Sequence, residues 1–256
     1  MSRLMYLVQR LKDRLLQKQL RYGPKRTPGV ALVTGANKGI GLEVVRQLSE
    51  EGWMVILCAR SRESGSQAAT KAGKRVVFVE LDVTSQTSIA AAAQEVSGLT
   101  GAVDLLVNNA AILLREQDQS VCEVNVDVLR QCWETNCLGP LLTTRALLPL
   151  LRNSKAARVI NVSTEISRLS RMRQSFPAYC ISKTGLNAVT RQLSAACQAD
   201  GIPVNALCPG WVKTDMGGPG ATIPIEQGAR AIVRLGTEVS GDITGMFIAN
   251  GRILPW

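Results

Sequence analysis

Short apolar segments alternate with longer amphipathic segments along most of the chain, from about residue 29 to its end. Short apolar runs are typical of buried parallel strands, and the segments between them have the spacing of helices that cover a sheet. This alternation predicts one α/β domain on a doubly wound parallel sheet, with the ligand at the carboxyl ends of the strands. The predicted strands are Val30–Thr34, Met54–Ala59, Val76–Glu80, Leu105–Asn108, Val159–Val162, Pro203–Leu207 and Gly245–Ala249.

The first predicted strand leads into a glycine-rich turn, Gly35 to Gly41, and a helix is predicted over Leu42–Glu51. A strand-to-helix turn of this kind exposes backbone N–H groups that can bind the pyrophosphate of a dinucleotide. Gly35 and Gly39 allow the tight turn and the close approach of a ligand, and Gly41 allows the helix to pack on the strand. Alone, the turn could be purely structural. Its position between strand and helix favours a dinucleotide site of Rossmann type.

The first 28 residues form an extension that precedes a domain over residues 29–256. Eight basic residues and one acidic residue give the extension a formal charge of +7, out of +10 for the chain. Apolar residues recur between these charges at helical spacing, which predicts a basic amphipathic helix over Ser2–Leu20 and a linker over Gly23–Pro28. The apolar stripe is too interrupted to span a bilayer. Three roles stay open: contact with an anionic membrane surface, packing on the domain or a partner subunit, and organelle targeting by residues 1–27.

The composition excludes several kinds of site. The chain has 256 residues, 46% of them hydrophobic, which suits one large domain and leaves no room for a second catalytic one. Histidine is absent, which excludes His-based triads and His metal sites and leaves tyrosine and lysine for proton transfer. The cysteine spacing fits neither a disulfide framework nor a zinc site, and no nucleic-acid-binding module is recognised. The cysteines, predicted to be buried, reduced thiols of a cytosol-like compartment, are Cys58, Cys122, Cys132, Cys137, Cys180, Cys197 and Cys208.

Tyr179 and Lys183 stand four residues apart, so they share one face of a predicted helix far downstream of the glycine turn. Together the two motifs resemble those of the short-chain dehydrogenase/reductase family, and the resemblance extends from about Pro28 to Trp256. The family implies a Rossmann-type fold, a nicotinamide cofactor and a homodimer or homotetramer. The other matching segments are Leu81-Asp82-Val83, Asn108-Asn109-Ala110, Asn136, Asn161-Val162-Ser163-Thr164 and Cys208-Pro209-Gly210.

The end of the second predicted strand indicates which cofactor is bound. An acidic residue there would accept a hydrogen bond from a ribose 2′-OH and repel a 2′-phosphate, but the chain has Arg60. Lys38 in the glycine turn adds a positive charge, and the resemblance gives a basic residue there the same role. Either could be a solvated charge; both together, without an acid, predict NADP(H) rather than NAD. The resemblance also implies contacts from Asn37 and Ile40 in the turn, Asp82 and Val83 at the adenine, Asn109 and Ala110 at the ribose or nicotinamide, and Pro209, Gly210, Val212 and Thr214 at the nicotinamide amide.

Reduction of a carbonyl needs a proton donor and a hydrogen bond at the oxygen on which negative charge develops. Tyr179 is the predicted acid. The nearby ammonium of Lys183 and the cationic oxidised nicotinamide would favour its phenolate and so lower its pKa. By the resemblance, Lys183 also binds the nicotinamide ribose, and Asn136 anchors the water of a proton relay. Thr164 takes the place of the serine that binds the substrate oxygen. Ser163 is the alternative, because the family most often has Ser-Ser at this point.

These motifs predict an NADPH-dependent reductase that converts a ketone, aldehyde or quinone to an alcohol. The glycine turn and the segment Cys208–Met216 look like the carbonyl reductase and C-factor-like branch of the family. The short segment Gly217–Ala221 leaves little material for a lid, which favours an open site for varied or flat substrates. The arginines before Tyr179, Arg168 among them, either rim this pocket or form a solvated surface. The alternative function is an NADP(H) sensor with little turnover. The predicted location is the cytoplasm, with membrane association or organelle targeting open.

Overall fold

The computed structural model describes residues 19–114, 120–239 and 242–256. Within these residues the chain forms an eight-stranded sheet of order β3-β2-β1-β4-β5-β6-β7-β8, parallel except for the antiparallel pair β7 and β8. The chain returns from β3 to the other side of β1 to form β4, which makes the sheet doubly wound as predicted. The strands are β1 (Val30–Thr34), β2 (Met54–Ala59), β3 (Val76–Glu80), β4 (Leu105–Asn108), β5 (Arg158–Val162), β6 (Val204–Cys208), β7 (Phe247–Ala249) and β8 (Arg252–Leu254).

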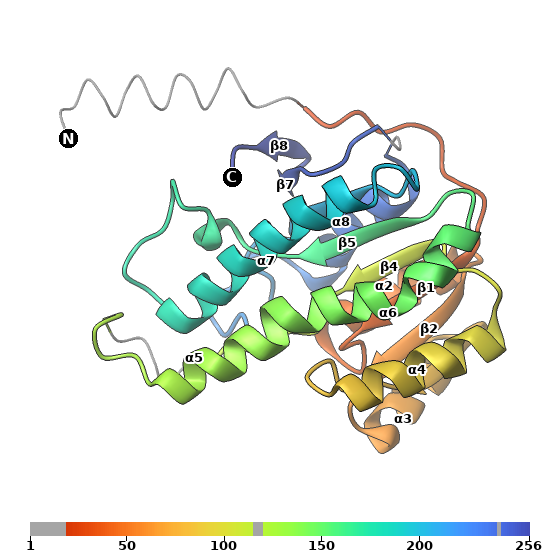
Figure 1. The fold of residues 1–256 in the computed structure, drawn as a ribbon, viewed down its shortest axis with the longest axis horizontal. Coiled ribbons are helices and arrows are strands. Elements are labelled where there is room, and N and C mark those ends of the chain that lie inside the picture. Colours follow the sequence, from red (N-terminus) through yellow and green to blue (C-terminus); the bar gives the residue numbers. More distant parts are fainter. Residues whose placement is uncertain (1–18, 115–119, 240–241) are drawn as a thin grey trace.

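Helices cover both faces of this sheet, and each face has its own buried apolar cluster. In Figure 1, α4, α6 and α7 lie in front of the sheet, whereas α2, α3 and α8 pack on the other face. The described helices are α2 (Gly39–Glu50), α3 (Arg62–Ala72), α4 (Gln86–Leu99), α5 (Val126–Trp133), α6 (Gly139–Asn153), α7 (Pro177–Ala196) and α8 (Ile225–Thr237), with a π-helical turn η2 (Glu134–Leu138) and a 3-10 turn η3 (Glu165–Ser167).

The predicted strands are all present, with shifts of one or two residues at some ends. β5 begins at Arg158, β6 runs one residue later than predicted, and β7 begins at Phe247. The prediction missed β8, because a three-residue edge strand is too short to show an alternating pattern. Helix α2 begins at Gly39, inside the glycine turn, so its first turn lies directly at the end of β1.

The predicted basic helix Ser2–Leu20 lies outside the described residues except for Gln19 and Leu20. The helix prediction is wrong for these two residues. Gln19 forms an antiparallel β-bridge with Arg252, and Leu20, which is buried, donates its N–H to the Gly251 carbonyl at 2.9 Å. The exposed edge strand β8 offers these backbone groups partners that a helix end would not.

Residues 19–28, which we call the N-terminal strap, lie along the domain and are drawn in red in Figure 1. The predicted linker is therefore attached to the domain. Gly23 donates its N–H to the carbonyl of Glu238 at 2.7 Å, and Arg26 donates its N–H to the carbonyl of Thr237 at 2.8 Å. Within the part of the chain that the structure describes, no helix is long and apolar enough to cross a membrane.

All seven cysteines are free thiols, and six of them are buried. Cys122 is the exception to the predicted burial. Cys122 is exposed in a turn that precedes α5. A lone cysteine outside a regular apolar pattern does not indicate whether its side chain is buried.

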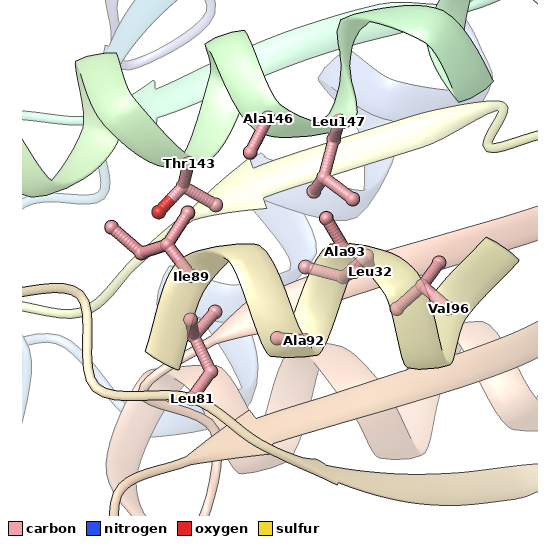
Figure 2. A pocket seen from close by; sticks show the side chains of 9 residues that line it. All are labelled: Leu32, Leu81, Ile89, Ala92, Ala93, Val96, Thr143, Ala146 and Leu147. Carbon is pink, nitrogen blue, oxygen red and sulfur yellow. The ribbon is translucent and has the colours of Figure 1, made fainter. Parts of the chain in front are cut away.

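A cavity of about 10 Å³ lies between α4 and α6, lined by apolar side chains and by Thr143 (Figure 2). The Thr143 hydroxyl is buried and has no hydrogen-bond partner within the described residues. We expect Thr143→Val, which keeps the shape and removes the hydroxyl, to raise the free energy of unfolding by about 1 kcal/mol in urea denaturation.

Thr144 is the matched control for this prediction. Its hydroxyl donates to the Pro140 carbonyl at 2.7 Å and accepts from Asn108 at 3.0 Å. Thr144→Val should therefore lower the free energy of unfolding by about 1 to 3 kcal/mol, because the Asn108 amide loses a partner in the core. Equal changes in the two variants would contradict the assignment of Thr143 as an unsatisfied group.

Candidate active site

The glycine turn between β1 and α2 fits a dinucleotide pyrophosphate. Gly35 has a φ of 60°, and a Cβ on it would lie 2.6 Å from the Ala110 Cα, so only glycine is accommodated. Asn109 braces the turn, because its side-chain amide donates to the carbonyls of Thr34 and Gly35 at 2.9 and 3.0 Å. Lys38 precedes α2 without a side-chain cap, which leaves the amides of the first helical turn for a ligand.

The two basic residues predicted to bind the 2′-phosphate, Arg60 and Lys38, differ in their ion pairing. Arg60 is exposed at the end of β2, and its guanidinium has no ion pair or hydrogen bond within the described residues. Lys38 forms an ion pair with Asp215 at 2.7 Å, with both side chains mostly exposed. Asn37 donates to the Ser64 hydroxyl at 3.1 Å, which joins the turn to α3 beside Arg60.

The remaining predicted cofactor residues follow strands β3, β4 and β6 at the same carboxyl edge. Asp82 accepts two hydrogen bonds from Thr84 through one carboxylate oxygen, at 2.9 and 2.7 Å, and leaves the other oxygen free of that turn. Thr214 uses its hydroxyl within its own loop, donating to the Val212 carbonyl at 3.3 Å and accepting from the Gly217 N–H at 3.0 Å. The structure brings to this edge Ile40 and Gly41 from α2, Val83 after β3, Asn109 and Ala110 after β4, and Pro209 and Gly210 after β6.

Tyr179 and Lys183 lie in the first two turns of α7. Lys183 is 2% exposed and donates to the Val162 carbonyl at 2.7 Å, at the carboxyl end of β5. Burial lowers the pKa of this lysine to about 8. Its ammonium lies 6.0 Å from the centre of the Tyr179 ring.

The pKa of Tyr179 lies above its ordinary value, because burial of the phenol disfavours the phenolate. The sequence alone predicts the opposite shift, from the charge of Lys183. In this structure burial outweighs the charge of Lys183, which directs its ammonium at the Val162 carbonyl. The phenol therefore keeps its proton at neutral pH.

Asn136 lies in the π-helical turn between α5 and α6 and is fully buried. Its side-chain oxygen accepts from the Ile112 N–H at 2.8 Å, and its amide donates to the Ile112 carbonyl at 2.9 Å and to the Ser182 hydroxyl at 3.0 Å. Such turns often occur at functional sites because they redirect one side chain. Asn136 thus ties the segment after β4 to α7.

Ser163 and Thr164 differ in what their hydroxyls contact. Ser163 is 4% exposed and donates to the Asn187 side chain at 2.7 Å, away from solvent. Thr164 is half-buried, and its side chain lies near the sulfur of Cys208, beside which Tyr179 also lies. Thr164 is therefore the member of the pair whose hydroxyl shares the surroundings of Tyr179.

Some residues of this region were missed by the sequence reasoning. Ser182 supports Asn136 and donates to the Tyr179 carbonyl at 2.8 Å; its place between Tyr179 and Lys183 was the available signal. Asp215 pairs with Lys38, which no local pattern indicates. Arg168 was expected on a pocket rim or a solvated surface, but it is 3% exposed and donates to the Pro255 carbonyl at 2.6 Å.

Comparison with known proteins agrees with the fold. The family model for short chain dehydrogenase matches residues 29–221. Short-chain dehydrogenase/reductase 1 of Saponaria officinalis is 31% identical, covering 88% of this chain and 95% of the relative. Carbonyl reductase [NADPH] 1 of Mus musculus is 32% identical over 89% of this chain and 98% of its own. The crystal structure of NADPH-bound carbonyl reductase from chicken fatty liver superposes with a TM-score of 0.81, at 29% identity, over 90% of this chain and 100% of that one. The chain therefore belongs to the short-chain dehydrogenase family.

Proposed function

We propose that this protein is an NADPH-dependent carbonyl reductase with Tyr179 as the proton donor. One observation carries the proposal: a half-buried tyrosine that keeps its proton, a buried lysine and a half-buried threonine converge at the sheet edge beside the glycine turn. The names of the mouse and chicken relatives support the same activity and cofactor. The protein is an NADP-dependent oxidoreductase, and its direct test is NADPH oxidation with a panel of carbonyl compounds.

The cofactor would be held by groups at the carboxyl edge of the sheet. The first-turn amides of α2 would bind the pyrophosphate, and Arg60 and Lys38 would bind the 2′-phosphate. Lys38 would have to leave Asp215 or share its charge, at small cost because the ion pair is exposed. Asp82 and Val83 would contact the adenine, and the loop from Pro209 to Thr214 would hold the nicotinamide. NADPH, when bound, supplies the hydride for the carbonyl carbon.

The side chains of the site supply the proton and stabilise the developing charge. Thr164 donates a hydrogen bond to the carbonyl oxygen, and Tyr179 transfers its phenolic proton to that oxygen as negative charge builds up. Lys183 stabilises the resulting phenolate and binds the nicotinamide ribose. Asn136 anchors the water that returns a proton through Lys183.

The substrate carbonyl is expected to carry a flat apolar group. Ile166, Leu169 and Trp211 are large apolar side chains with exposed fractions of 38%, 74% and 56%, and they follow Thr164 and Gly210 in the chain. Trp211 is held by a hydrogen bond from its ring N–H to the Gly217 carbonyl at 2.9 Å. An exposed aromatic ring directly after Gly210 favours stacking with quinones and aromatic carbonyls.

The pH dependence of turnover follows from Lys183. Its pKa of about 8 lies below the ordinary value, so the ammonium is present below pH 8 and lost above it. The raised pKa of Tyr179 keeps the phenol protonated over the same range. We expect kcat for carbonyl reduction, measured at saturating NADPH, to fall as the pH rises through about 8. In Lys183→Arg, which stays charged, this fall should disappear; a flat wild-type profile would contradict the role given to Lys183.

Arg60→Gln should raise the KM for NADPH roughly tenfold, because one charged hydrogen bond to the 2′-phosphate is lost at an exposed position. The KM for NADH, which has no 2′-phosphate, should not change. Arg75→Gln is the matched control, since Arg75 is exposed at the opposite edge of the sheet and bonds the Gly52 carbonyl. If Arg60→Gln changed the KM for NADPH and the KM for NADH equally, Arg60 would not be a ligand of the 2′-phosphate.

A further inference from the structure

A second hollow lies at the opposite edge of the sheet from the active site. Its volume is about 430 Å³, and it lies between the N-terminal strap, the first residue of β5 and the segment that follows α8. Neither the glycine turn nor the Tyr179 region contributes to it. The side chains that line it and enter the argument are Arg21, Tyr22, Arg26, Arg158 and Glu238.

Two of these arginines converge on the C-terminal end of α8. Arg158 is 8% exposed, and its Nη1 donates to the carbonyls of Leu235 and Val239 at 3.0 and 2.8 Å. Arg26 donates from its Nη1 to the Gly236 carbonyl at 3.3 Å. The Nε of Arg158 is buried and has no hydrogen-bond partner within the described residues. The buried cation is therefore not fully satisfied by the protein.

The positive charge here is only partly balanced. Burial and then the charge of Arg26 lower the pKa of Arg158 to about 10, which shows that the two guanidinium groups repel one another. Within residues 19–114, 120–239 and 242–256, neither of them forms an ion pair. The C-terminus of α8 contributes about half of one negative charge, which is less than two cations need.

The two carboxylates nearest these arginines are already engaged. Glu238 pairs with Arg234 at 2.7 Å. Burial lowers the pKa of Arg26, and the charge of Asp104 offsets only part of this shift. The oxygens of Asp104 accept from the Val30 N–H at 2.8 Å and the Ser154 hydroxyl at 2.5 Å. Arg21, exposed at the rim, adds a further cation.

We propose that this hollow, bounded by Arg26, Arg158 and the strap, is a binding site for a phosphate group. A phosphate carries up to two negative charges and presents acceptor oxygens in several directions, which suits guanidinium groups that approach from the strap and from the sheet. The volume exceeds that of the ion alone, so the phosphate of a small organic ester would also be accommodated. Such a ligand would fix the strap on the domain, independently of the reductase reaction.

The test measures the melting temperature of the full chain in phosphate, with saturating NADPH present so that the cofactor's own phosphate sites are filled. Potassium chloride of equal ionic strength is the reference. If the dissociation constant is about 1 mM, 20 mM phosphate should raise the melting temperature by roughly 4 °C over the reference. Arg26→Gln should lose most of this shift, and Arg145→Gln, an exposed arginine on α6, should keep it.

A second melting measurement, with glycerol 3-phosphate in place of inorganic phosphate, distinguishes an organic phosphate ester from the inorganic ion. A larger shift with the ester indicates an organic ligand, an equal shift indicates inorganic phosphate, and both support the site. In chloride, Arg26→Gln must have the melting temperature of wild type and must retain NADPH oxidation. If Arg26→Gln does not fold, Arg21→Gln at the rim replaces it and should reduce the phosphate-dependent rise of the melting temperature. The proposal is overturned by a wild-type shift no larger than in chloride, by equal shifts in wild type and the strap variant, or by acetate acting as strongly as phosphate.

Discussion

Replacing Tyr179 with phenylalanine is expected to lower kcat for carbonyl reduction by about 10³-fold, because general acid catalysis contributes about 10² to 10⁴. The phenol is half-buried and protonated, and the neighbouring thiols of Cys208 and Cys180 have raised pKa values, so neither thiol is an equivalent acid at neutral pH. The dissociation constant for NADPH, measured by fluorescence titration, should stay within about threefold of wild type, since the phenol ring remains.

Tyr22→Phe is the control for this variant. Tyr22 lies in the N-terminal strap, where its ring stacks under Arg234 at 3.6 Å. Loss of its hydroxyl should leave kcat unchanged. Substantial turnover in Tyr179→Phe would show that another group donates the proton.

Thr164→Val is expected to lower kcat by about 10²-fold or more, the loss typical of one hydrogen-bond donor to a developing oxyanion. Thr164→Ser keeps the donor and should retain most of the activity. The shape of the side chain is nearly unchanged in valine, so the loss reports on the hydroxyl and not on packing.

Ser163→Ala separates the two hydroxyls at this position. Ser163 donates to Asn187 in the interior, so its loss should lower the free energy of unfolding by about 1 to 2 kcal/mol while kcat changes little. The reverse pattern, with activity lost in Ser163→Ala and kept in Thr164→Val, would transfer the oxyanion role to Ser163.

The strands and the glycine turn could be predicted because their determinants are local. Each buried parallel strand is a short apolar run, and the turn has glycine at a position where a Cβ would contact Ala110. The carboxyl-edge placement of Arg60, Asp82 and Thr214 then followed from the topology alone, because parallel strands bring their ends together.

The properties that could not be predicted depend on contacts between distant segments. The pKa of Tyr179 is governed by burial rather than by the lysine one turn away. Arg168 was treated as surface or rim because the Pro255 carbonyl that it bonds lies far along the chain. Likewise, Gln19 is extended because β8, itself too short to recognise, pairs with it. The oligomeric state, the location and the role of residues 1–18 remain predictions from the sequence.

The most direct test of the central claim measures NADPH binding and NADPH oxidation in the same preparation of the wild-type protein. The carbonyl panel contains quinones, isatin-like diketones and aromatic aldehydes, and the alcohol formed is quantified against the NADPH consumed. We expect one alcohol per NADPH with at least one class, at rates well above the protein-free reaction. Tight NADPH binding with no turnover across the whole panel would contradict the reductase and favour a sensor on the same fold.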